Sequence, residues 1–250
     1  MLTKLQRHLR RMSRARHFQV RFWRRATFKQ PNEVRIGDRM TPIASPVEHG
    51  AAADFITCFI EDEYGLGEIR FPVATIIDIG ANIGFLSMAA RAYFPDATIH
   101  AYEPNPRVLA YARKNAAAAG FELFNEAVGG TAGTVSIEDS GDSNQAITRS
   151  GGTSGVQVPQ ITLSTAVARL GGRIDLAKID CEGAEWEMFN DAAAWSHIRH
   201  LRMEYHLWGK HSYADVVAAL DRLGFVIHLH NDSGEFGTVW ARNARASATS

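Results

Sequence analysis

The sequence predicts a doubly wound α/β fold whose sheet is mostly parallel and ends on an antiparallel strand. From about residue 74 onward, short apolar strand-like segments alternate with helix-like segments, and this alternation places parallel strands between two layers of helices. The last two strand-like segments, FVIHLHN and TVWARN, are joined only by a turn at 232–237. So short a connection requires these two strands to run antiparallel.

The individual elements follow from hydrophobic periodicity and from residues that begin or end helices. Near the amino terminus apolar residues recur at helical spacing, at Leu2, Leu5, Leu9 and Met12. Farther on, Asn105 can cap a helix and Gly120 can end it. In chain order we expect short strands and turns between Pro31 and Pro46, a helix at 47–64, strand 74–80, helix 85–94, strand 98–103, helix 106–119, strands near 121–125 and 134–138, strand 175–180, helix 184–194, strand 200–206, helix 213–223, and closing strands 225–231 and 238–243.

Length and composition fit one domain with extensions. The chain has 250 residues, of which 46% are hydrophobic, enough to bury one substantial core. We expect a basic arm with short connecting elements at 1–46, the main domain at 47–243 and a flexible tail at 244–250. The two cysteines, Cys58 and Cys181, are far apart in the sequence, which favours a reducing, cytoplasmic compartment. No run approaches the roughly 18 apolar residues that span a bilayer.

The charges are distributed unevenly along the chain. Residues 1–30 contain ten Lys and Arg and no acid, so the remainder carries 27 − 10 = 17 cations against all 27 acids. No apolar segment follows this basic start, which argues against a secretory signal. The arm could pack on the domain through its apolar stripe, or contact an anionic membrane or glycolipid surface. Nucleic acid is the least favoured partner, because no base-reading module accompanies the arm.

The strongest local motif is IDIGANIGF at 77–85, a strand followed by a glycine loop and a helix. Gly80 and Gly84 permit a tight turn and the close approach of a bulky cofactor. A phosphate loop would show GxxxxGK[ST], and a dinucleotide loop would have a glycine in place of Asn82. The carboxylate of Asp78 disfavours a pyrophosphate and favours a ligand that carries an ammonium and a sulfonium, which is S-adenosylmethionine. A turn without any ligand is the alternative.

Glu103 is the second expected cofactor residue. It lies 23 residues after Gly80 (103 − 80), at the end of the next strand. A carboxylate at this position can accept hydrogen bonds from both hydroxyls of a ribose. Glu103 alone fits NAD as well as S-adenosylmethionine, but together with Asp78 and the loop it favours the latter.

At this point the sequence resembles the FkbM family of S-adenosylmethionine-dependent methyltransferases. The matching segments occur in the family's order between about residues 75 and 206: IDIGANIG, YEPNP, EAVGG, KIDCEGAE and EYH. Cys181 occupies a position that varies in the family, and the basic arm lies outside the resemblance. The resemblance implies a class I methyltransferase (Rossmann-like) fold and methyl transfer to a hydroxyl oxygen of a sugar, glycolipid or secondary metabolite.

The resemblance also implies roles for particular residues. The cofactor site would comprise Asp78, Gly80, Ala81, Asn82, Gly84, Phe85, Glu103, Pro104, Ala127 and Val128. The reaction centre would lie at Asp180 and Glu182, beside which the strand end supplies Glu204 and His206. Glu204 and His206 are two residues apart and therefore share one face of a strand.

An alcohol must lose its proton to accept a methyl group, so the site needs a base or a metal ion. The candidates for the base are His206 and Asp180, and a divalent cation could be held by Asp180, Glu204 and His206. Glu185 lies nearby in the sequence, and the polar stretch 139–155 is expected to be a lid over the acceptor, with Asn144 or Gln145 in contact with it. Two other functions stay open: a non-catalytic protein that binds S-adenosylmethionine, and an NAD-dependent oxidoreductase.

Overall fold

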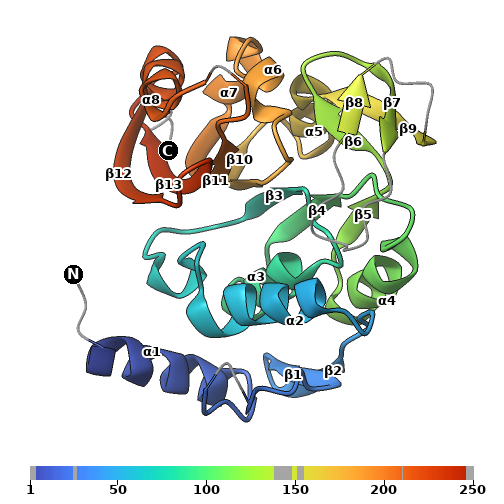
Figure 1. The fold of residues 1–250 in the computed structure, drawn as a ribbon, viewed down its shortest axis with the longest axis vertical. Coiled ribbons are helices and arrows are strands. Elements are labelled where there is room, and N and C mark those ends of the chain that lie inside the picture. Colours follow the sequence, from blue (N-terminus) through green and yellow to red (C-terminus); the bar gives the residue numbers. More distant parts are fainter. Residues whose placement is uncertain (1–3, 25–26, 138–147, 151–154, 210, 246–250) are drawn as a thin grey trace.

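A seven-stranded sheet divides the protein into two helical layers. The computed structural model describes residues 4–24, 27–137, 148–150, 155–209 and 211–245. The strand order is β12-β13-β11-β10-β3-β4-β5 (Figure 1). The strands are β3 (Thr75–Ile79), β4 (Thr98–Tyr102), β5 (Glu122–Phe124), β10 (Ile174–Ile179), β11 (Ile198–His206), β12 (Phe225–Asp232) and β13 (Phe236–Asn243).

The sheet has the predicted mixture of directions. The central pairs β10–β11, β10–β3, β3–β4 and β4–β5 are parallel. Strand β13 lies between β11 and β12 and runs antiparallel to both. The expected antiparallel closing strand is therefore confirmed.

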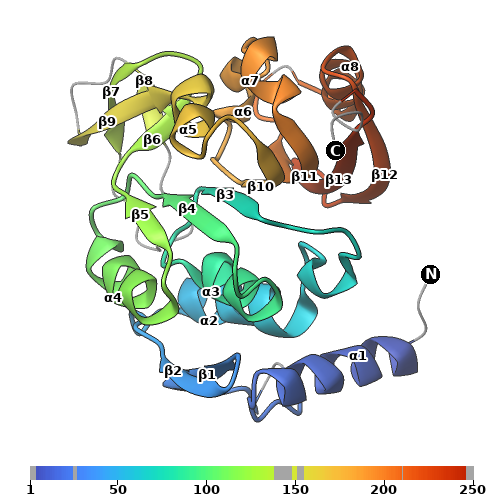
Figure 2. The same cartoon turned by 180° about the vertical axis from the view of Figure 1, so that it is seen from behind.

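Helices cover both faces of this sheet. One face carries α2 (His49–Phe55), α3 (Phe85–Tyr93) and α4 (Leu109–Ala119), and the other carries α5 (Leu163–Arg169), α6 (Glu185–Met188), α7 (Ala192–Ser196) and α8 (Tyr213–Arg222) (Figures 1 and 2). Each face buries its own apolar cluster, as expected for a sheet covered on both sides. Among the described residues, no helix has the length and apolar character needed to cross a membrane.

The amino-terminal segment forms an outer layer. Helix α1 (Lys4–His17) and the hairpin of β1 (Glu33–Ile36) and β2 (Arg39–Pro42) lie on the far side of α2, α3 and α4 from the sheet (Figure 2). Phe18 contacts Phe59 edge-on at 4.9 Å between ring centroids, which attaches the arm to the main domain. The helical spacing near the amino terminus corresponds to α1, and the short strands and turns expected at 31–46 correspond to β1 and β2; their pairing as a hairpin was not predicted.

Several predicted elements differ in detail. The expected helix at 47–64 consists of α2 followed by a π-helical segment, Ile56–Glu61. The expected helix at 106–119 begins only at Leu109, and the one at 184–194 is two short helices, α6 and α7, of which α7 is capped by Asp191. Sequence analysis missed α5 and the parallel pair β6 (Ala127–Gly129) and β9 (Val156–Thr162).

A second, smaller sheet has the order β6-β9-β7-β8. Its other strands are β7 (Gly133–Ile137), which corresponds to the strand predicted near 134–138, and β8 (Thr148–Ser150). Most of the expected lid at 139–155, with Asn144 and Gln145, lies outside the described residues.

Candidate functional site

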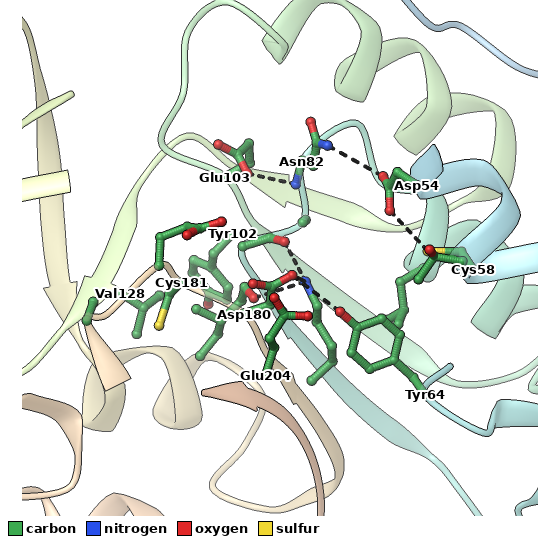
Figure 3. A pocket seen from close by; sticks show the side chains of 18 of the residues that line it. Asp54, Cys58, Tyr64, Asn82, Tyr102, Glu103, Val128, Asp180, Cys181 and Glu204 are labelled. Carbon is green, nitrogen blue, oxygen red and sulfur yellow. Dashed lines mark hydrogen bonds and ion pairs between the residues drawn. The ribbon is translucent and has the colours of Figure 1, made fainter. Parts of the chain in front are cut away.

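A cavity of about 280 Å³ opens where the central parallel strands end. It is lined from the carboxyl ends of β3, β4, β10 and β11, and from α2 and the π-helical segment (Figure 3). In open α/β sheets ligands bind at this edge. Six acidic side chains line the cavity, against a single lysine among the described residues: Asp54, Glu63, Glu103, Asp180, Glu182 and Glu204, with Lys178.

The glycine loop brings two strand ends into close contact. Gly80 has φ +73°, and a Cβ there would lie 1.6 Å from the backbone oxygen of Asp180. Only glycine allows β3 and β10 to approach in this way. Asn82 also adopts a left-handed backbone, with φ 50°, which asparagine tolerates better than most residues. The loop backbone at 80–82 therefore forms one wall of the cavity.

Glu103 is fixed to this loop by two backbone amides. Its Oε2 accepts a hydrogen bond from the Asn82 N–H at 2.7 Å (Figure 3). Its Oε1 accepts one from the Asn105 N–H at 2.7 Å. Burial raises the pKa of Glu103 to about 7, although the two amides act in the opposite direction. Each carboxylate oxygen keeps a further lone pair for a ligand that donates hydroxyl hydrogens.

Asp54 was not predicted as a site residue, and it faces the loop from α2. Its Oδ2 lies 3.5 Å from the Asn82 Nδ2, and its Oδ1 lies 3.4 Å from the Cys58 Sγ (Figure 3). Burial raises the pKa of Asp54 to about 6. Because this pKa still lies below 7, the carboxylate adds negative charge beside the glycine loop at neutral pH. Cys58 is a free thiol.

Lys178 is the buried counter-charge of the site. Its Nζ donates to the backbone oxygen of Gly80 at 2.5 Å and lies 3.5 Å from Asp78 Oδ1 and 3.6 Å from Asp180 Oδ2. Burial opposes its charge, but Asp180 and Asp78 outweigh that effect and raise the pKa of Lys178. Because two carboxylates surround this ammonium, little positive charge is left for an anionic ligand.

Asp180 lies between the glycine loop and the carboxylates around His206, Glu182 and Glu204. Its Oδ2 faces the Tyr64 hydroxyl at 3.3 Å and the Lys178 ammonium (Figure 3). The other oxygen, Oδ1, has neither of these contacts. The side chain is 26% exposed, so Asp180 can touch a ligand in the cavity.

His206 connects the remaining carboxylates. Its Nε2 lies 3.3 Å from Glu182 Oε2 and 3.5 Å from Glu204 Oε1, and its Nδ1 lies 3.4 Å from Glu185 Oε1. Burial alone would lower the pKa of His206, but these three carboxylates raise it to about 10. The side chain is therefore an imidazolium at neutral pH, which disfavours the predicted role of His206 as a base.

The same group has a geometry that a metal ion could use. Asp180, Glu182 and His206 each offer one ligand atom, and these atoms lie within 4.8 Å of one another. This set contains Glu182 in place of Glu204, which the sequence analysis had grouped with Asp180 and His206. Carboxylates suit Mg²⁺ and Mn²⁺, and a neutral imidazole suits Zn²⁺. The His206 imidazolium would have to lose its proton before it could bind a metal ion.

The structure brings most of the predicted cofactor residues into the cavity wall. They are Gly80, Ala81, Asn82, Glu103, Pro104, Ala127 and Val128. The predicted reaction-centre residues Asp180, Glu182 and Glu204 also line the cavity, with His206 directly behind them. The glycine loop and Glu204, which are more than 100 residues apart in the chain, thus meet at one edge of the sheet.

Three predicted cofactor residues lie outside the cavity wall. Asp78 is fully buried behind the loop, where Ser87 donates a hydrogen bond to it at 2.7 Å. A Cβ at Gly84 would meet the Phe121 ring at 2.6 Å, so this glycine serves the packing of α3. Phe85 is buried in the aromatic cluster of α2 and α3. The acidic charge expected from Asp78 comes instead from Asp54 and Asp180.

Tyr64, Asp54 and Lys178 are the main site residues that sequence reasoning missed. Lys178 is part of the quoted KIDCEGAE segment, and a lysine near the end of a strand expected to be buried is a usable signal. Asp54 is an acid within the apolar run AAADFITCFI, which is a weaker signal of the same kind. Nothing in the sequence marks Tyr64.

One protein family matches the chain. The methyltransferase FkbM domain matches residues 78–227, more than half of the chain. This range contains the glycine loop, Glu103 and the cluster around His206, while Asp54, Tyr64 and the basic arm precede it. Among curated protein sequences, none matches the chain.

Solved methyltransferase structures resemble the chain distantly. A precorrin-6y methyltransferase from Geobacter metallireducens has a TM-score of 0.48 and 14% identity, over 80% of this chain and 93% of its own. An O-methyltransferase family protein from Burkholderia thailandensis has a TM-score of 0.47 and 13% identity, over 79% of this chain and 60% of its own. Likeness at this level says nothing about the substrate.

Proposed function

The chain belongs to the FkbM methyltransferase family, and from that premise we propose that it transfers the methyl group of S-adenosylmethionine to a hydroxyl oxygen of a sugar, a glycolipid or a secondary metabolite. The charge of the cavity carries the proposal. Six acidic side chains outnumber Lys178 and the His206 imidazolium behind the wall. The excess of acids attracts a ligand with a sulfonium and an ammonium, and repels a diphosphate such as that of NAD.

The residues of the cavity wall fit the parts of this donor. Glu103, held by two amides, can accept hydrogen bonds from the two ribose hydroxyls. Tyr102, Ala127 and Val128 form the less polar end of the wall, where an adenine ring would lie. Asp54 and the loop at Gly80 line the same cavity and would hold the amino-acid end of the donor. When bound, the donor supplies a methyl group already activated by its sulfonium.

We assign the removal of the acceptor proton to Asp180. One of its oxygens faces Tyr64 and Lys178, which fixes the orientation of the carboxylate and leaves Oδ1 free to accept a hydroxyl hydrogen. The close approach at Gly80 places the backbone of Asp180 directly beside the glycine loop, and its side chain lines the same cavity. Such alignment of the acceptor oxygen with the methyl group is the main contribution of a methyltransferase site.

The surface beside the cavity favours an acceptor with a sugar ring. Trp208 is 39% exposed and Phe236 is 43% exposed, and both rings lie next to His206, at 4.9 Å and 6.4 Å between centroids. Exposed aromatic faces can pack on the C–H face of a pyranose while its hydroxyls bond to nearby carboxylates. Glu182 and Glu204 are the carboxylates within reach of this surface.

Asp180→Asn tests the assignment, because it keeps the side-chain size and an oxygen that accepts from Tyr64. We expect turnover, measured as transfer of labelled methyl to components of a cell extract, to fall by about 10²- to 10⁴-fold. The affinity for S-adenosylhomocysteine should change by less than about threefold. Asp96→Asn, an exposed acid at the opposite edge of the sheet, is the matched control and should leave both unchanged. A protein that only binds the donor would show no turnover in the wild type.

A divalent cation held by Asp180, Glu182 and His206 is the second way to activate the hydroxyl. Removal of metals with EDTA distinguishes the two. If Asp180 acts as a simple base, turnover persists after EDTA treatment. If a cation is needed, turnover is lost and returns when Mg²⁺ or Mn²⁺ is added.

A further inference from the structure

The basic arm has an inner and an outer side with different properties. On its inner side three arginines of α1 attach the helix to acids of the main domain: Arg10 to Glu68 at 2.6 Å, Arg11 to Glu61 at 2.8 Å, and Arg14 to Asp62 at 3.1 Å. Ala15 and Phe18 are buried beside these pairs. The helix is therefore held in a fixed orientation on the domain.

The outer side exposes large apolar side chains. Leu5 is 67% exposed, Leu9 is 58% exposed and Trp23 is 70% exposed. Leu5 and Leu9 are one turn apart and share a face of α1. His8, from the same part of the helix, contacts the Trp23 ring edge-on at 6.1 Å between centroids. Trp23 thus lies beside the leucines, and Met12 and Trp23 line one shallow hollow. We call Leu5, Leu9 and Trp23 the apolar ridge.

The arm exposes cations as well as the apolar ridge. Those exposed on the arm, apart from the three paired arginines, are Lys4, Arg7, Arg16, Arg21, Arg24 and Lys29. Residues 1–30 contain no acid, so the arm itself contributes only positive charge to this surface. The apolar stripe of the arm was expected either to pack on the domain or to contact a membrane. In the structure two of its residues, Leu5 and Leu9, are exposed to solvent.

This combination selects one kind of partner. Exposed leucines and a tryptophan on a cationic amphipathic helix are the features of helices that lie in the interface of a bilayer, where arginines contact lipid phosphates. Nucleic acid would use the cations but would leave the apolar ridge in water. A second copy of the chain would bring two positive surfaces together.

We propose that the outer side of α1, together with Trp23, docks the protein on an anionic phospholipid surface. The arm is the outermost layer of the molecule (Figures 1 and 2). It rests on the π-helical segment Ile56–Glu61, whose Thr57 and Cys58 line the cavity. One short segment therefore separates the arm from the methyl-transfer site. The docking itself is independent of the acceptor's identity.

Vesicle sedimentation with the full chain tests the proposal. Vesicles of phosphatidylcholine with about 30% phosphatidylglycerol should bind the protein at least about tenfold more tightly than pure phosphatidylcholine vesicles, and raising the salt should weaken binding. Leu5→Gln/Leu9→Gln/Trp23→Gln should reduce binding at least about tenfold. The matched control is Val47→Gln/Val226→Gln, which changes two exposed apolar residues outside the arm, and it should bind as the wild type does. Circular dichroism and a thermal melt establish that each variant is folded.

Three results would overturn the proposal. The first is an absence of binding to anionic vesicles by the folded wild-type chain. The second is undiminished binding by the folded ridge variant, which would reduce the contact to charge alone. The third is tighter binding to duplex DNA than to the vesicles, which would assign the arm to nucleic acid. Each readout is lipid or DNA binding, so failure here is distinguishable from failure of the methyl-transfer proposal.

Discussion

The affinity for the donor should depend on pH through Glu103. The pKa of this carboxyl is raised to about 7 by burial, and both its oxygens accept backbone amides. Protonation of either oxygen would place an O–H against an N–H and remove an acceptor needed by the ribose. If only the ionised form binds, the affinity falls by the factor 1 + 10^(pKa − pH). This factor is about 11 at pH 6.0 and about 1.3 at pH 7.5, so the affinity should be about eightfold weaker at pH 6.0.

Calorimetric titration with S-adenosylhomocysteine measures this difference, because the compound has the ribose but no reactive methyl group. An eightfold change corresponds to about 1.2 kcal/mol, which calorimetry resolves. Glu103→Gln should weaken binding by roughly 10- to 100-fold at pH 7.5. Apart from about a twofold change left by Asp54, whose pKa is about 6, this variant should lose the pH dependence. Glu33→Gln, an exposed position on β1, is the control and should retain it. Equal affinities of the wild type at the two pH values, or an unchanged slope in Glu103→Gln, would refute the reasoning.

Three further predictions concern stability. Gly80→Ala should lower the free energy of unfolding in urea by at least about 3 kcal/mol, because φ at this position is +73° and the new Cβ would lie 1.6 Å from the backbone oxygen of Asp180. Gly37→Ala, at φ +63° with open space around it, should lower it by only about 1–2 kcal/mol. Equal losses in the two variants would contradict the close approach at Gly80. Lys178→Met should cost about 3–5 kcal/mol, since it leaves two carboxylates without their buried counter-charge; a variant as stable as the wild type would show that the lysine is not needed for charge balance. The ligand-free protein should be more stable near pH 5 than near pH 8, because the pKa of Glu103 is raised from 4.5 to about 7 in the folded state. The resulting stabilisation of about 3 kcal/mol is complete below about pH 4.5 and is lost as the pH rises through about 7. A urea midpoint that rises with pH would contradict this.

The sequence was sufficient for the parts of the site that local motifs encode. The alternation of strands and helices, the glycine loop and the acid at Glu103 are each visible within short segments, and the sheet topology brings them to one edge. The antiparallel closing strand followed from the length of a turn. The family resemblance drew on the same short segments.

Contacts between distant segments could not be predicted. Asp78 and Glu103 belong to neighbouring strands and face the same side of the sheet, because Asp78 pairs with Ala101. Asp78 lies within β3, whereas Glu103 follows the end of β4, and this difference in depth decides which carboxylate reaches the cavity. Asp54 and Tyr64 enter the site only because the packing of α2 and the π-helical segment places them there. The pKa of His206 likewise depends on three carboxylates whose positions are known only from the folded chain.

A crystal structure of the protein with S-adenosylhomocysteine would test the central claim most directly. We predict that the ribose hydroxyls will bind Glu103, that the adenine will lie beside Val128 and that the sulfur will face Asp180. A ligand bound elsewhere while the acidic cavity stays empty, or a dinucleotide whose diphosphate occupies the glycine loop in a competing soak, would contradict it.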